Sequence, residues 1–438
     1  MVESALINTL LGSLLGAIAG MVPGSGLLVS LLLVYPYLVS LDLVSLLCFY
    51  IGLANLAQYT GSITAIHFGI PGESNSLPAV IEGHALSKQG KSHTAIVGTA
   101  LASTLSAVIS VFFLIAISPF YQSIFSMFYK SINQLIVFVM AICIFVLIGK
   151  NNWKDNLLLM LAGFVIGKIG MNDYTGSYFL TFNNLYLSAG IPFFPMIVGL
   201  LVFPQLFKKY DFDATTQNIS NIWPSIKLFV KNMHYAIMGT LTGIFLGLIP
   251  AISTVLSTNI SHKIAKKLDR QDPSYRALIS AEASNNSAVL MTLMPLLLLG
   301  IPITGSEALL VAVMERNLFD LNWTVLRTQG LIPSLLLSVS IATFLGLLVS
   351  WPMANVLCKF FNSIKKHINL LIFLMLFVCI VFAGWLDSSV VYYVIVFAVF
   401  GALGWCLKKY DVLPFIFLFL IQARLESVAI ISYNLYVQ

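Results

Sequence analysis

Hydrophobic residues form long runs along this chain, and short polar loops separate the runs. Apolar runs long enough to cross a hydrocarbon core of about 30 Å as helices recur from residue 5 to residue 422. A β-barrel would instead show alternating strands of about ten residues. Polar residues concentrate in 205–234, after which hydrophobicity resumes. The pattern therefore predicts an all-α polytopic membrane protein with two transmembrane repeats, 1–204 and 235–438, joined by the polar linker 205–234.

A pattern of glycine and proline occurs once in each half. The first copy is Gly16, Gly20 and Pro23, and the second is Gly243, Gly247 and Pro250, at an offset of 227. A second match follows in the same order, because Gly69-Ile70-Pro71 recurs as Gly300-Ile301-Pro302 at an offset of 231. Two ordered matches predict an internal duplication.

The prolines of these motifs predict helix breaks inside the membrane. Pro23 is followed by Gly24-Ser25-Gly26, and Pro71 by Gly72 and then Glu73, Ser74 and Asn75. Proline removes a helical hydrogen bond and glycine removes rigidity, so neither run continues a helix without loss. The apolar arms around the second break, 61–69 and 76–81, are too short to span. Each break is therefore either a broken spanning helix or a re-entrant hairpin.

The distribution of basic residues favours the re-entrant interpretation. We take 5–40, 60–83, 235–257 and 290–314 as re-entrant. Ten other segments cross the membrane, and 43–58 and 277–289 are among them. Eighteen of the 23 basic residues then lie on one face of the membrane, as the positive-inside rule requires. If all four broken segments spanned, the division would be 13 against 10. The preferred topology has about five crossing helices and two broken or re-entrant segments in each half, so the two repeats are inverted.

Composition excludes several classes of protein. The chain is 59% hydrophobic and only 9% charged, whereas about a quarter of the residues of a soluble domain are charged. The net charge of +6 comes from scattered loop residues rather than a basic tract, so nucleic acid is not implied. No HExxH, GxSxG or His/Cys metal spacing occurs. We therefore expect no enzyme, no cofactor and no metal beyond a transported Na⁺.

Inverted repeats with broken helices that meet near the midplane are a recurring plan of secondary transporters. Backbone N–H groups at the broken ends attract anions, and freed carbonyls coordinate Na⁺. Glu73 and Glu282 are costly near the bilayer centre and are therefore candidates for ion coupling. The predicted substrate site lies between the two broken motifs. Its residues are Pro23, Gly24, Ser25, Gly26, Tyr59, Gly61, Ser62, Thr64, Gly69, Pro71, Gly72, Ser74, Asn75, Ser253, Asn285, Asn286, Gly300, Pro302 and Thr304.

These motifs resemble those of the large membrane subunit of tripartite tricarboxylate transporters. The resemblance covers nearly the whole chain, and the first-half motifs are the most specific. In the first half it rests on Pro23 to Gly26, on Tyr59 to Ile66 and on Gly69 to Glu73, together with Glu82-Gly83 and Lys88 to Lys91. In the second half it rests on Glu282-Ala283, Asn285-Asn286, Pro295 and Leu299 to Pro302, with Gly401 to Leu407 and Glu426 near the end.

The resemblance implies a multi-pass secondary importer of di- and tricarboxylates in the prokaryotic cytoplasmic (inner) membrane. It also implies two protein partners, a small membrane subunit and a periplasmic substrate-binding protein. A Na⁺ or H⁺ gradient would supply the energy without an ATPase, by an elevator-like alternating-access mechanism. The alternative that stays open is a stand-alone ion-coupled anion carrier or channel that works without a binding protein.

Overall fold

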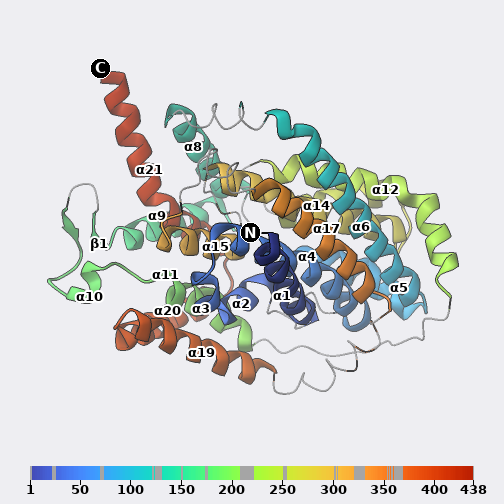
Figure 1. Ribbon diagram of the computed structural model, residues 1–438, viewed down its shortest axis with the longest axis horizontal. Coiled ribbons are helices and arrows are strands. Elements are labelled where there is room, and N and C mark those ends of the chain that lie inside the picture. The colour runs from blue at the N-terminus through green and yellow to red at the C-terminus, as the bar shows by residue number, and fades with distance from the viewer. Residues whose placement is uncertain are drawn as a thin grey trace.

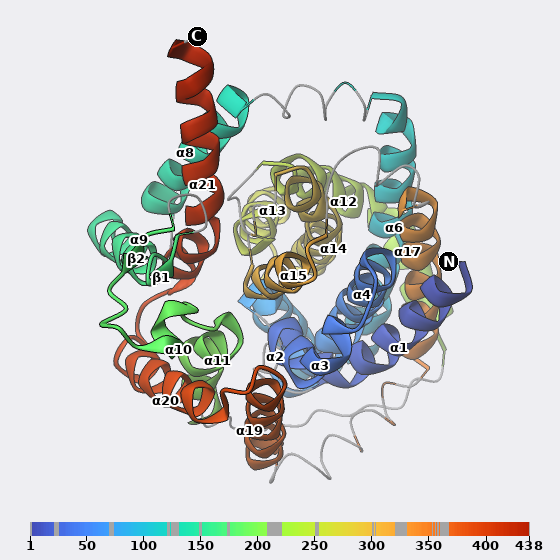
Figure 2. The same ribbon diagram turned by 60° about the vertical axis from the view of Figure 1, so that its left-hand side comes forward.

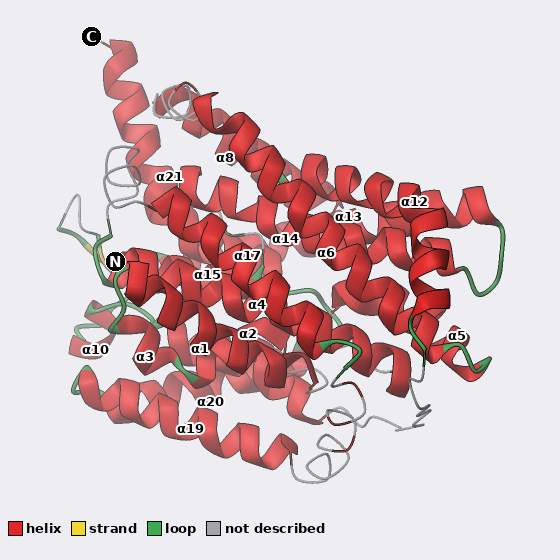
Figure 3. Cartoon of the chain, turned by 45° about the vertical axis from the view of Figure 1, so that its right-hand side comes forward, coloured by secondary structure: helices red, strands yellow, loops and turns green. Residues whose placement is uncertain are grey.

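The computed structural model consists mainly of helices packed side by side (Figure 1; Figure 3, helices in red). Two short strands, β1 (Gly170–Met171) and β2 (Tyr178–Phe179), pair as an antiparallel hairpin. The all-α class predicted from the hydrophobic pattern is therefore confirmed. The structure describes the chain apart from residues 1, 22–25, 70–73, 121–122, 124–130, 149–150, 173–175, 208–220, 250–253, 300–301, 303, 320–330, 353, 355, 357–358, 360–367 and 438.

Helices follow one another along both halves. Those of the first half are α1 (Val2–Met21), α2 (Gly26–Leu33), α3 (Tyr35–Val39), α4 (Leu43–Phe68), η1 (Ser74–Ser76), η2 (Ala79–His84), α5 (Ala85–Lys88), α6 (Ser92–Ile117), η3 (Ser118–Phe120), α8 (Ser131–Ile148), α9 (Trp153–Gly167), α10 (Leu185–Ser188), α11 (Phe193–Ile197), η4 (Val198–Val202) and η5 (Phe203–Phe207). Those of the second half are α12 (Trp223–Gly247), α13 (Thr254–Asp269), α14 (Tyr275–Leu299), α15 (Gly305–Arg316), α17 (Leu331–Val349), α19 (Ile368–Leu386), α20 (Val390–Cys406) and α21 (Leu413–Val437). The C-terminal end of α21 projects away from the other helices (Figure 1), while the rest of this helix packs against α8 and α9.

The burial of the apolar helices is that of a membrane protein. Among the described residues, α1, α4, α6 and α17 are long and apolar enough to cross a membrane. Large apolar side chains on the outer helices are exposed, such as Leu14, Phe112 and Phe344, each more than 60% exposed. Lipid accepts such side chains, and water does not. Every residue of α4 is buried, and α1, α6 and α17 pack against this helix.

Three glycines spaced four residues apart place α1 directly against the backbone of α4. A Cβ added to any of them would lie 2.1 to 2.4 Å from a carbonyl oxygen of α4. Small residues at this spacing let two helix backbones approach closely. Residue numbers rise together on the two helices, so α1 and α4 run parallel, and the segment containing α2 and α3 returns the chain to the starting side. The pairs are Gly12 with Phe49, Gly16 with Leu53, and Gly20 with Ala57.

The same contact recurs between α12 and α14. Three glycines of α12 face α14, and a Cβ on any of them would lie 2.0 to 2.9 Å from a carbonyl oxygen of that helix. These helices also run parallel. Each glycine lies 227 residues after its counterpart in α1, and each partner lies 231 residues after its counterpart in α4. The pairs are Gly239 with Ser280, Gly243 with Ser284, and Gly247 with Ala288.

In the second half, α13 brings the chain back between its two parallel helices. Ser257 lies 2.9 Å from Ser284, and Ser261 lies 2.9 Å from Ser280, between side-chain oxygens, so α13 runs antiparallel to α14. Figure 2 shows α12 to α15 as one group beside the group formed by α1 to α4. Helix α6 packs against α14 and α12, and α17 packs against α4. The two groups thus share a common interior.

Three predicted boundaries differ from the structure. Helix α4 continues to Phe68 and helix α14 to Leu299, so both extend beyond the crossings predicted at 43–58 and 277–289. The hydroxyls of Ser62 and Thr64 donate to carbonyls one turn earlier in α4, which lets the helix carry polar residues without breaking. The helix ends at Gly69, whose φ of 66° suits glycine. Residues 223–234 of the predicted linker are helical in α12.

The glycine contacts lead to a stability prediction. Gly16→Ala and Gly239→Ala should each lower the stability of the folded protein by about 1–3 kcal/mol, because the new methyl group meets a backbone carbonyl that cannot move aside. Thermal unfolding in detergent measures the change. The control is Gly61→Ala, whose Cβ would find its nearest neighbour at 3.6 Å. Equal Tm values for all three variants and the wild type would contradict the backbone contact.

Candidate functional site

Polar side chains from three helices meet at one buried carboxylate in the shared interior. The Ser62 hydroxyl of α4 donates to Oε1 of Glu282 in α14 at 2.7 Å. Ser103 of α6 and Asn286 of α14 each donate to the same oxygen at 3.4 Å. Glu282 is only 4% exposed. The carboxylate is therefore held by neutral donors from both halves of the chain.

A second contact joins the halves close to the break that follows α4. Asn75 in η1 donates through Nδ2 to Oδ1 of Asn285 in α14 at 2.8 Å. Both side chains are at least 95% buried. A buried amide pair of this kind fixes the position of η1 against α14, because either partner would lose its hydrogen bond if the two separated.

A small cavity lies beside these contacts. Five of the residues predicted from sequence line it: Gly26, Gly61, Ser62, Asn75 and Asn285. They come from α2, α4, η1 and α14, so the fold brings together segments more than 200 residues apart in the chain. Gly20, Leu27, Ala57, Gln58 and Ser76 complete the lining.

A second cavity lies between α4 and α14. Its polar lining consists of Asn55, Gln58 and Asn286, and Gln58 lines both cavities. Sequence analysis did not select Asn55 or Gln58. The signal was present, because Asn55, Gln58 and Ser62 recur at helical spacing in a mainly apolar helix and so share one face.

Several predicted site residues make local contacts away from the two cavities. The Tyr59 hydroxyl lies 3.0 Å from the Thr104 hydroxyl of α6, while its ring packs against Gly346 of α17, so this side chain points away from the cavities. Thr64 donates to a carbonyl of its own helix. Gly69 ends α4, and a Cβ added to Gly69 would lie 2.8 Å from the side chain of His84.

Thr304 also has a local role, because it caps the N-terminus of α15. Its side chain accepts from the backbone N–H of Glu307, and the Glu307 carboxylate accepts from the backbone N–H of Thr304. This reciprocal pair satisfies two N–H groups that no helical carbonyl reaches. Pro302, just before it, is buried.

Part of the predicted site lies outside the described residues. This applies to residues at each of the four breaks, among them one of the two ion-coupling candidates, and of Ser74 only the backbone is described. The residues concerned are Pro23, Gly24, Ser25, Pro71, Gly72, Glu73, Ser253 and Gly300.

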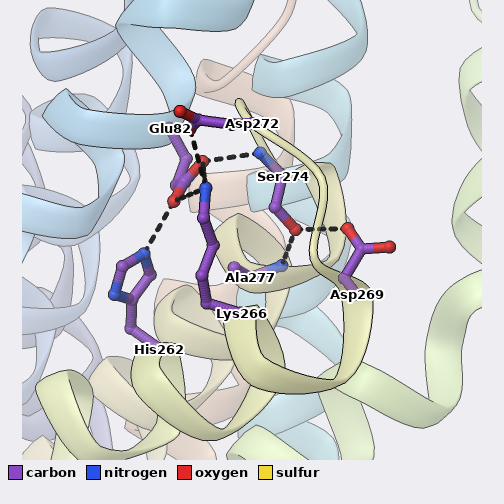
Figure 4. Close-up of polar contacts among 7 residues, drawn as sticks. All are labelled: Glu82, His262, Lys266, Asp269, Asp272, Ser274 and Ala277. Carbon is purple, nitrogen blue, oxygen red and sulfur yellow. Dashed lines mark hydrogen bonds and ion pairs between the residues drawn. The ribbon is translucent and has the colours of Figure 1, made fainter.

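A separate charged cluster connects η2 to α13 and to the turn between α13 and α14, outside the helices long enough to span (Figure 4). Oε1 of Glu82 lies 2.9 Å from His262 Nε2 and accepts from Lys266 Nζ at 2.8 Å. Its Oε2 accepts from the backbone N–H of Ser274 at 2.6 Å. Lys266 also contacts Asp272, whose side chain is 89% exposed. The cluster therefore connects η2 of the first half to α13 and the turn that follows it in the second half.

The charge of Glu82 is stabilised although its side chain is only 1% exposed. Burial alone would raise the pKa of this carboxyl, but the hydrogen bonds from His262 and Lys266 outweigh burial and hold the pKa below its usual value. Ser274 contributes a further backbone donor and also caps α14, since its Oγ accepts from the backbone N–H of Ala277 at 3.0 Å. Glu82 is thus ionised at neutral pH.

Comparisons with known proteins identify the family. The family model described as "Tripartite tricarboxylate transporter TctA family" matches residues 6–418. A curated relative from Agrobacterium vitis, described as "Uncharacterized 52.8 kDa protein in TAR-I ttuC' 3'region", is 26% identical over 315 residues. That alignment spans 70% of this chain and 61% of the relative. No solved structure matches this chain.

The Glu82 cluster leads to a pH prediction. Glu82→Gln should lower stability at pH 7 by about 1.5–3 kcal/mol, because it removes hydrogen bonds to a charged group. Since the folded-state pKa is lowered, the carboxylate contributes this stability above its unfolded pKa of about 4.3 and loses it as pH falls through the folded value. Thermal unfolding between pH 7 and pH 3.5 should therefore show the wild type approaching the variant only below about pH 4.3.

The matched control is Glu3→Gln, the same chemical change at an exposed carboxylate of α1. It should leave the unfolding temperature unchanged across this range. A Glu82→Gln protein as stable as the wild type at pH 7 would contradict the ionised, paired state of Glu82.

Proposed function

The chain belongs to the tripartite tricarboxylate transporter TctA family, and on that premise we propose that it is the large permease subunit of a binding-protein-dependent secondary transporter. It imports organic di- and tricarboxylates across the prokaryotic cytoplasmic membrane. A periplasmic binding protein delivers the substrate, and a small membrane subunit accompanies the permease. A Na⁺ or H⁺ gradient drives uptake.

Support for two repeats comes from the glycine contacts. The pairs between α1 and α4 and those between α12 and α14 are related by the same two offsets, 227 and 231, that relate the sequence motifs. A chance likeness of short motifs would not also match three successive contacts. The repeats in this proposal are 1–204 and 235–438.

Support for the re-entrant topology comes from helix direction. If 5–40 spanned the membrane, α1 and α4 would cross in opposite directions, yet they run parallel. The contact of Glu82 with Lys266 agrees, because the re-entrant topology places both on the basic face, whereas four spanning breaks would place them on opposite faces. Each half then has an odd number of crossings, and the two repeats are inverted as in many secondary transporters.

The observation that carries the proposal is that side chains from both repeats meet in one buried interior. Ser62 bonds to Glu282, and Asn75 bonds to Asn285, so each polar contact has one partner in each repeat. Secondary transporters bind their substrate at such a repeat interface, between broken helices. The carboxylate groups of the substrate bind the N–H groups of the breaks, and Glu282 and Glu73 couple the ion. Movement of this interface relative to the surrounding helices gives an elevator-like alternating access.

Uptake by reconstituted protein tests the proposal. Liposomes containing this chain and the small subunit should accumulate labelled citrate or a related carboxylate only with the binding protein outside and an imposed Na⁺ or pH gradient. Liposomes without this chain are the control. Uptake by this chain alone would instead favour the stand-alone carrier, and no uptake of any carboxylate under any gradient would contradict both proposals.

The proposed anion site gives a second prediction for transport. Gly24→Val and Gly72→Val should each reduce uptake at least tenfold, because a branched side chain blocks the approach of substrate to backbone N–H groups. Loss of a single hydroxyl, as in Ser62→Ala, should cost less. Size-exclusion chromatography checks that each variant is folded. Wild-type uptake by both glycine variants would show that the site assignment is wrong.

A further inference from the structure

Two amide oxygens on one face of α4 are buried without a hydrogen-bond donor. They are Oδ1 of Asn55 and Oε1 of Gln58, and neither has a partner among the described residues. Asn55 is 6% exposed and Gln58 is 8% exposed. Both line the cavity between α4 and α14. Buried polar atoms in proteins are nearly always paired, so two orphaned acceptors in one cavity point to a ligand that they bind.

A buried carboxyl group lies next to the same cavity. Glu282 accepts hydrogen bonds from hydroxyl and amide donors, but it takes part in none of the ion pairs formed by the described residues. A carboxylate buried in a membrane protein without a cationic partner is costly. The site therefore holds an acidic side chain that no basic side chain among the described residues neutralises.

Continuous contacts connect the carboxylate to the orphaned oxygens. The Ser62 Oγ lies 2.7 Å from Oε1 of Glu282 and 3.0 Å from the backbone carbonyl of Gln58, one turn earlier on α4, so its single O–H is shared between these two oxygens. Asn286 bonds to Glu282 and lines the cavity together with Asn55 and Gln58. The charge and the free acceptors therefore belong to a single polar site between the two helices.

The chemistry of this site selects the ligand. Amide oxygens do not take up a proton at neutral pH, so a proton alone would leave both acceptors unsatisfied. Hard oxygen donors with a single carboxylate suit a monovalent cation, whereas Ca²⁺ and Mg²⁺ sites usually use more carboxylates or bound phosphates. No cluster of three His, Cys, Asp or Glu side chains suited to a metal ion occurs in the described part of the chain.

We propose that Asn55, Gln58 and Glu282 form a Na⁺ site between α4 and α14. The inference rests on the proposed function in one respect, because it identifies the coupling ion of that transporter as Na⁺ rather than H⁺. Its place beside the cavity lined by Ser62, Asn75 and Asn285 puts the cation next to the proposed carboxylate site. A bound Na⁺ would there offset the charge of Glu282 and of the incoming anion.

The test measures Na⁺ binding without any carboxylate, binding protein or small subunit. The purified chain in detergent is heated in NaCl, KCl or choline chloride at equal ionic strength. Na⁺ should raise Tm saturably, by about 3 °C or more at concentrations well above Kd, and K⁺ and choline should not. In Gln58→Met, which keeps the length of the side chain and removes the amide oxygen, the Na⁺ concentration for half the effect should rise roughly tenfold or more.

The chain offers a matched control in α21. Oε1 of Gln422 is also a buried acceptor without a partner among the described residues, but it lies outside both cavities. Gln422→Met should therefore keep the wild-type response to Na⁺. Asn55→Leu provides a second test if Gln58→Met does not fold, and it should weaken the response in the same way.

The outcomes separate this inference from the proposed function. An equal rise in Tm with all three salts, or a wild-type Na⁺ response in both Gln58→Met and Asn55→Leu, would overturn the Na⁺ site even if carboxylate uptake is observed. Selective Na⁺ stabilisation lost in those variants and kept in Gln422→Met would establish the site even if no carboxylate is transported.

Discussion

Lipid gives apolar helices no hydrophobic reason to associate, so the centre of this protein depends on direct contact between helix backbones. Glycines of α1 lie against carbonyls of α4, and glycines of α12 lie against carbonyls of α14. Each contact holds two parallel helices together. Parallel neighbours in a chain require a returning segment between them, which contains α2 and α3 in the first half and α13 in the second. The same close packing with a returning segment therefore occurs in both halves.

Burial of α4 explains why the polar residues of this interior form a connected network. Every residue of the helix is buried, so Asn55, Gln58 and Ser62 have no access to bulk water. Ser62 reaches Glu282 across the interface, and Asn75 reaches Asn285. Unpaired polar atoms are expensive in such surroundings. Pairing within the protein ends at the oxygens of Asn55 and Gln58, and we propose that a bound cation offsets the cost there.

Much of this could be predicted from sequence, for identifiable reasons. Hydropathy is a local property and predicted the helical membrane class. The repeated glycines and prolines predicted five residues that line one cavity. Hydropathy could not place the ends of α4, because hydroxyls bonded to the preceding turn let polar residues continue a helix. Nor could it distinguish Tyr59, which turns toward α6, from its neighbour Gln58, because orientation within a helix depends on which helices surround it.

The surroundings of Glu82 and Glu282 differ in charge, since Glu82 lies among basic side chains and Glu282 among neutral ones. Glu82 has Lys266 and His262 beside it, so its charge is already balanced and its contacts hold η2 against α13. Glu282 has hydroxyl and amide donors, which orient a carboxylate without neutralising it. A carboxylate without a basic neighbour can bind a cation that leaves again, whereas a lysine would occupy the position permanently. Among the described residues Glu282 takes part in no ion pair, and this is the property on which we base its proposed role in ion coupling.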